Sequence, residues 1–156
     1  MREHRGTTAP AGGNHRVSGL RERVGSALMA RTPTLEVATW GRRLPDAADS
    51  DPGEDAVEAL VTRRIRAMSI VFLPIDDEPG PDSMRGYISR NSVALLSGFT
   101  QTPIDPPSTH WLGRWCACER VSQSGLWNPD QVDDPVDPRF MDKLTDLVRG
   151  SALVVY

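Results

Sequence analysis

Apolar residues recur every three or four positions in four stretches of the chain, which is the spacing of an amphipathic helix. The pattern predicts helices over residues 17–30, 54–66, 83–97 and 137–150. Ser18 precedes the first of these stretches as a capping residue. The last prediction is the clearest, because Asp137 caps the helix, Pro138 occupies its first position and Gly150 closes it.

One segment has the composition of a strand. Residues 69–74, Ser-Ile-Val-Phe-Leu-Pro, are short, mostly apolar and end at a proline. A single strand cannot satisfy its own backbone hydrogen-bonding groups, so a second strand must pair with it. That partner is either residues 34–40 or a strand absent from this chain. The order of the elements predicts an α+β fold with very little β structure.

The composition divides the chain into three parts. Residues 1–16 contain almost no large apolar side chain and are expected to form a disordered arm. Residues 17–150 are long enough for a single domain with a modest core, and 151–156 form a short C-terminal tail.

The charge is distributed unevenly along the chain. Its net value is −3, so no global positive field points to a nucleic-acid partner. The first 43 residues are nevertheless basic on balance, and Lys143 is the only lysine in the protein. Arginine binds phosphate bidentately, which favours DNA as a partner. An excess of arginine over lysine is also the default composition of a GC-rich gene, and both interpretations stay open.

The two cysteines indicate a reducing compartment. Cys116 and Cys118 are too close in sequence for an unstrained disulfide, and only His110 could extend them toward a zinc site. No apolar run approaches the roughly 18–20 residues of a membrane span, and no signal peptide opens the chain. We therefore expect a cytoplasmic protein with no membrane partner.

The residues from 85 onward carry a family resemblance. The helical segment RGYISRNSVALLS and the block from His110 to Gly150, which includes the segment SGLWN ending at Asn128, are similar to the C-terminal part of a GIY-YIG-type nuclease domain. More loosely, the resemblance reaches back to Gly13. It implies a small, mostly helical α+β domain around a short antiparallel sheet. It also implies cleavage of a DNA phosphodiester by water, with one divalent metal ion, Mg²⁺ or Mn²⁺, and a tyrosine-assisted proton transfer.

The resemblance also implies the site residues. The segment NHRVSGLRERVGSAL matches the family helix that supplies a catalytic arginine, which would be Arg21 or Arg23. Ser89 stands where the family has its metal-binding glutamate, and serine has no carboxylate for a hard cation. Arg85 and Asn128 match positions expected to contact the substrate. The alternative for the two helix arginines is a solvent-facing structural role, and for Asn128 a local hydrogen bond.

Three tryptophans fall in or beside the matched block. Trp111, Trp115 and Trp127 either pack in the core, as tryptophans in small domains commonly do, or stack on unpaired bases. We expect Trp127 to pack.

Two departures from the family pattern bear on activity. Besides Ser89, neither a Gly-Ile-Tyr nor a Tyr-Ile-Gly triplet occurs, and Tyr87 and Tyr156 are the only tyrosines. The tyrosine-bearing hairpin is therefore expected upstream of residue 1. The sequence predicts a truncated GIY-YIG-like endonuclease that is weakly active or inactive. The alternative is a non-catalytic module that binds DNA or a protein.

Overall fold

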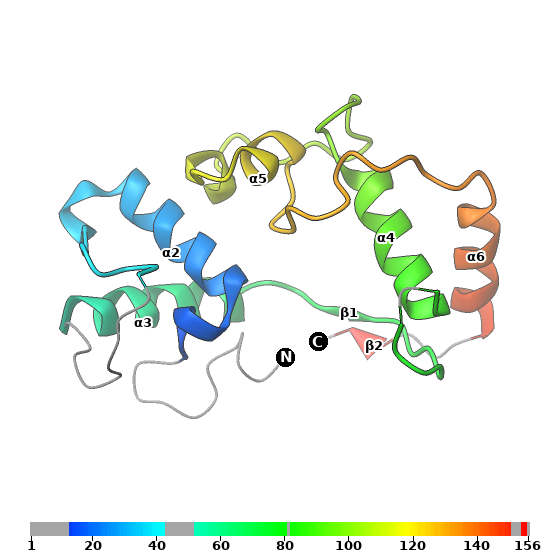
Figure 1. Cartoon of the computed structure of the whole chain (residues 1–156), viewed down its shortest axis with the longest axis horizontal. Coiled ribbons are helices and arrows are strands. Elements are labelled where there is room, and N and C mark those ends of the chain that lie inside the picture. The colour runs from blue at the N-terminus through cyan, green and yellow to red at the C-terminus, as the bar shows by residue number, and fades with distance from the viewer. Residues whose placement is uncertain (1–12, 43–51, 81, 151–153, 156) are drawn as a thin grey trace.

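The computed structural model describes residues 13–42, 52–80, 82–150 and 154–155. Its longer helices are α2 (Gly19–Arg31), α3 (Pro52–Arg66), α4 (Met84–Leu96) and α6 (Phe140–Gly150). Shorter elements are η1 (His15–Val17), η2 (Pro33–Leu35), η3 (Leu112–Trp115) and α5 (Glu119–Ser124). Figure 1 shows α2 and α3 on one side of the molecule, α4 and α6 on the other, and α5 between them.

All four predicted helices are present, with ends that differ from the prediction by up to three residues. Ser18 caps α2 as expected, because its Oγ accepts a hydrogen bond from the Arg21 backbone N–H at 3.3 Å. Ser83 does the same for α4, accepting from the Gly86 N–H at 3.0 Å. Asp137 accepts from the Arg139 N–H at 2.9 Å just before α6, so it orders the turn that leads into the helix.

The β structure is shorter than the sequence predicts. Strand β1 covers only Val71–Phe72 and pairs antiparallel with β2 (Val154–Val155). Residues 34–40, one of the two expected partners, instead contain part of η2 and a turn, so that prediction was wrong. The side chains of β1 are 66% and 49% exposed, so this ladder lies outside the core. The fold is a mostly helical one compatible with the α+β class, and a central sheet stays a prediction.

The main core lies between α2, α3, η3 and α5. Val24 and Ala27 of α2 face Val57 and Val61 of α3, and all four are essentially inaccessible to solvent. Leu112 of η3 and Val121 of α5 close this core from the other side of α2. A second, smaller packing region joins α4 to α6 and buries Ile88, Ala94 and Phe140.

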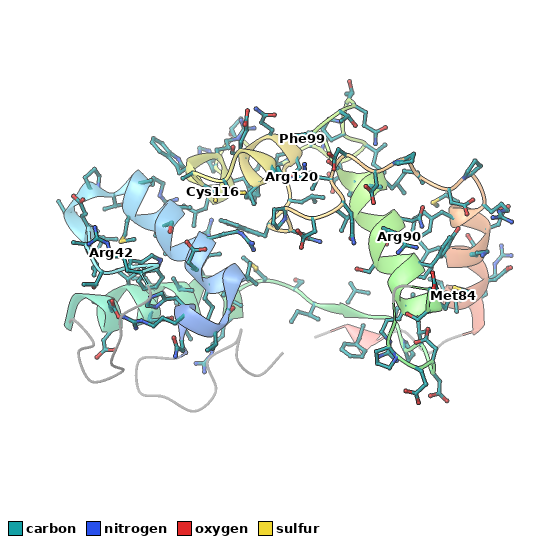
Figure 2. The ribbon with its side chains drawn as sticks, in the orientation of Figure 1. Arg42, Met84, Arg90, Phe99, Cys116 and Arg120 are labelled. Atoms are coloured by element: carbon teal, nitrogen blue, oxygen red, sulfur yellow. The ribbon has the colours of Figure 1, made fainter. Side chains whose placement is uncertain are left out.

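A few polar contacts tie the two regions together near the end of α4. The Gly98 N–H donates to the Ser124 carbonyl at 2.8 Å, and the Ser97 hydroxyl donates to the Val132 carbonyl at 2.6 Å. The Arg120 guanidinium lies 5.2 Å from the centre of the Phe99 ring, where its charge faces the π cloud. Figure 2 shows these two side chains between α5 and the top of α4.

The domain begins before residue 17. Residues 1–12 of the predicted arm lie outside the described residues, but 13–16 are described, and His15 is buried in η1. At the other end, Val154 and Val155 form β2, whereas the prediction left them in a tail. None of the helices in the described ranges is long and apolar enough to cross a membrane.

Candidate nuclease site

Arg21 lies at the centre of a buried ion pair. Its side chain is fully inaccessible, and its Nε donates to Glu58 Oε2 at 2.8 Å. One terminal nitrogen donates to the same oxygen, to the Glu58 carbonyl at 3.1 Å and to the Thr62 hydroxyl at 2.6 Å. These contacts fix the side chain of Arg21, from α2, on α3. The solvent-facing alternative was therefore wrong for Arg21, and a catalytic role for it stays a prediction.

His15 and Trp40 cover this ion pair. The His15 backbone N–H donates to Glu58, and its Nδ1 lies 3.0 Å from Glu58 Oε1. The Trp40 indole stacks on the His15 ring, with centroids 3.9 Å apart and planes 14° from parallel. The indole N–H in turn donates to the Glu22 carbonyl of α2 at 3.0 Å. The network therefore joins η1, α2, α3 and the turn at 38–41.

Arg23 is the more accessible of the two candidate arginines. Its side chain is half-buried, and its guanidinium folds back along α2 over Gly19. It also acts electrostatically on Cys116, so it faces the segment that follows η3. Of the two candidates, Arg23 has the position from which a guanidinium can reach a ligand.

Ser89 is exposed on α4, on the other side of the molecule from α2. Figure 2 marks this helix by Arg90 and Met84, far from Cys116, which lies over α2. The structure therefore does not bring Ser89 together with Arg21 or Arg23.

Arg85 holds the loop that precedes α4. Its Nε donates to Asp77 Oδ1 at 3.1 Å, and a terminal nitrogen donates to the Asp77 carbonyl at 2.6 Å and the Ile75 carbonyl at 3.2 Å. The Arg85 backbone N–H donates to the other Asp77 oxygen at 3.0 Å. The side chain stays half exposed, so this fixed guanidinium also presents charge to solvent.

Asn128 makes the local hydrogen bond that the sequence alternative describes. Its side-chain oxygen accepts from the Asp130 N–H at 3.0 Å, which forms an Asx turn. Trp127 packs as expected, against Trp111 and the core.

The family match extends over nearly the whole protein. A family model described as GIY-YIG domain matches residues 1–153. The chain belongs to the GIY-YIG domain family. No curated protein and no solved structure matches the chain. Membership indicates a nuclease-like function, and it confirms the resemblance drawn from residues 85–97 and the block after His110.

GIY-YIG nucleases generally use a divalent metal, and Ser89 does not fit one. A hard cation such as Mg²⁺ prefers charged oxygens, whereas Ser89 offers a neutral hydroxyl. Asp77, in the loop before it, is engaged by Arg85. In residues 13–42, 52–80 and 82–150, no group of three or more His, Cys, Asp or Glu side chains is placed to hold a metal ion.

Tyr87 is the one tyrosine in the described part of this GIY-YIG domain. Burial raises the pKa of its hydroxyl, and the Asp137 carboxylate raises it further. Its ring faces α6, with Lys143 Nζ 4.3 Å from the ring centre. A tyrosine whose pKa is raised and whose ring packs on α6 does not have the properties of a general base.

Glu58 is not among the predicted site residues, although the sequence contains a signal for it. Glu54, Glu58 and Thr62 are spaced four apart on α3, beside the apolar stripe of the same helix. All three are buried, and Glu54 pairs with Arg16 at 2.8 Å. A polar stripe with this spacing indicates a helix face that needs basic partners from elsewhere in the chain.

The two cysteines differ in environment, which predicts a difference in reactivity. Both are free, Cys116 is buried, and burial raises the pKa of its thiol. Because the thiolate is the reactive form, Cys116 should react with a disulfide reagent at pH 8 several-fold more slowly than the half-buried Cys118. The comparison uses Cys118→Ser and Cys116→Ser variants of the folded protein. Equal rates would show that the segment 116–118 opens readily.

Proposed function

We propose that this chain is a GIY-YIG-like domain that acts on DNA, with phosphodiester hydrolysis that is weak or absent. The family match supports the nuclease origin. One observation supports weak or absent hydrolysis. Ser89 occupies the position of the expected metal-binding glutamate and presents only an exposed hydroxyl on α4. No metal-binding cluster lies around it among the described residues. Its two free cysteines fit the cytoplasm as its location.

The charge distribution supports binding to DNA more than it supports cutting. Residues 13–42 contain five arginines and two glutamates, whereas the protein as a whole carries −3. Of these arginines, Arg21 is buried and adds nothing to the surface. Arg63 and Arg64, at the end of α3, are exposed. An arginine-rich surface near α2 would contact phosphates and would give an affinity that falls with salt. Within this proposal Arg23 is the arginine that meets a phosphate, and Arg21 has a structural role.

A plasmid-nicking assay tests the hydrolytic part. The wild-type protein with Mg²⁺ or Mn²⁺ should nick supercoiled DNA no faster than the Arg23→Ala variant. The half-buried Arg23 can be replaced without disturbing the core, so the variant is a matched control. Nicking by the wild type that disappears in Arg23→Ala would contradict the proposal.

A second comparison tests the assignment of Ser89. The Ser89→Glu variant returns a carboxylate to α4 and should bind Mn²⁺ more tightly than the wild type in a titration. Equal affinity would show that this position does not face a metal site.

The alternative is a non-catalytic module that binds a protein. The exposed Val71 and Phe72 of β1 favour it, because they form a small apolar surface beside an incompletely paired strand. Failure of the wild type to shift labelled duplex DNA at low salt would remove DNA and leave this function.

A further inference from the structure

Trp115 differs from the other three tryptophans of the protein. Trp40 is buried against His15, and Trp111 and Trp127 pack on each other with ring centroids 5.4 Å apart. Trp115, at the end of η3, is 52% exposed. Burying the apolar surface of an indole is favourable in free energy. A half-exposed ring that does not pack in the core can therefore gain stabilisation by contacting a ligand.

The segment around Trp115 lacks acidic residues. None of the 21 Asp and Glu residues of the protein falls between Pro106 and Cys118. His110 and Arg114 in this segment are both exposed. Arg114 donates to the Ser108 carbonyl at 3.3 Å and the Pro107 carbonyl at 3.4 Å, which fixes its side chain beside the loop. These two bonds use two of the five N–H groups that a guanidinium carries.

The segment 106–118 lies against α2, the helix that carries Arg23. η3 packs directly on α2, and Arg23 acts on the thiol of Cys116, the residue after Trp115. Glu22 acts on that thiol in the opposite sense, but its side chain reaches toward Gly41, whose Cβ would lie 3.4 Å from Glu22 Oε1. Figure 2 shows Cys116 on the segment above α2. The exposed ring and Arg114 therefore belong to an element that packs on the helix carrying Arg23.

We propose that His110, Arg114 and Trp115 form a stacking platform for unpaired bases of a DNA strand, with Arg23 on the neighbouring phosphates. The inference rests on the proposed action on DNA and adds the preference for unpaired bases. Aromatic rings stack on any base, and guanidinium groups neutralise the backbone, which together give binding to single strands without sequence preference. The other exposed side chains between 108 and 114 are polar or basic, and the absence of negative charge there favours a partner with an anionic backbone.

Fluorescence anisotropy of labelled oligonucleotides tests the platform. The strand should be longer than the roughly 4–16 nucleotides that such sites cover, and a duplex of the same length is measured beside it. Trp115→Ala should weaken single-strand binding by at least about fivefold, which corresponds to the lower end of measured stacking contributions. Trp115→Phe should lose less, because it keeps a ring. Ile104→Ala, which changes a side chain that is 66% exposed but outside 106–118, should change nothing.

The outcomes separate the platform from the proposed function. An unchanged single-strand Kd in Trp115→Ala, with DNA still bound, overturns the platform and leaves action on DNA standing. Equal weakening for strand and duplex overturns the preference for unpaired bases. Binding of neither DNA by the wild type at low salt overturns both proposals.

Intrinsic fluorescence supplies a second measurement if Trp115→Ala does not fold. Single-stranded DNA should quench the wild type more strongly than Trp115→Phe, because Trp40 is buried and Trp111 and Trp127 are half-buried and pack on each other. Equal quenching in both proteins overturns the platform.

Discussion

Arg21→Met should destabilise the domain by about 3–5 kcal/mol, the usual effect of removing one partner from a buried ion pair. For a chain of this size that corresponds to a melting temperature lower by about 6–20 °C. The reason is the position of Glu58, which stays buried after the change and loses the guanidinium that now contacts its carboxylate and its carbonyl. Thermal unfolding followed by circular dichroism measures the difference.

Two variants separate the ion pair from general damage to α2. Arg23→Ala removes a charge two residues away without touching Glu58, so its melting temperature should stay close to that of the wild type. The double variant Arg21→Met, Glu58→Gln leaves no unpaired buried charge and should be more stable than Arg21→Met alone, with a coupling energy of about 1–3 kcal/mol. A double variant as unstable as the sum of the two single changes would refute the ion pair as the cause.

This expectation changes how weaker DNA binding by Arg21 variants is interpreted. A binding assay on Arg21→Ala would report reduced binding through loss of the folded domain, whereas the same assay on Arg23→Ala reports on contact with DNA. The pair Arg21 and Arg23 was indistinguishable in the sequence, because both lie on one helix two positions apart. Only the position of α3, which supplies Glu58 and Thr62, separates them.

The helices were predictable because each carries its signal within its own residues. Periodic apolar positions and the capping residues Ser18 and Ser83 act over a few positions, so a single sequence contains them. The β ladder was not predictable in the same way. Its partner strand is Val154–Val155, at the far end of the chain, and a two-residue strand has no periodicity to detect.

The roles of the candidate site residues stay predictions, for a different reason. The family resemblance points to Ser89, Arg85 and Asn128, but it does not say what each side chain contacts. Arg85 is fixed by Asp77 and Asn128 by its own turn, and these contacts depend on the loops around them. The separation of α2 from α4 depends on how the two packing regions meet, which no local pattern encodes.

Gly25 is a second position where the structure predicts a large effect. A glycine in the middle of α2 weakens the helix by roughly 0.5–1 kcal/mol relative to alanine, so Gly25→Ala should stabilise the protein if propensity alone decided. A Cβ at this position would lie 2.0 Å from Trp40 Cζ2 and 2.5 Å from Cε2, so the indole would have to move. Moving it breaks its hydrogen bond to the Glu22 carbonyl and its stacking on His15. We expect a net loss of about 1–3 kcal/mol, as for other overpacked cores.

The measurement is chemical unfolding of Gly25→Ala beside Gly150→Ala. Gly150 ends α6, and a methyl group at its Cβ position would have no heavy atom within 4 Å, so its change should stay within about 0.5 kcal/mol of the wild type. Trp40→Phe removes the part of the indole that meets the new methyl group. In the Trp40→Phe background, Gly25→Ala should therefore cost little or become stabilising. A Gly25→Ala protein as stable as the wild type would contradict this prediction. It would show that the indole of Trp40 can move away from α2 without lowering the free energy of unfolding.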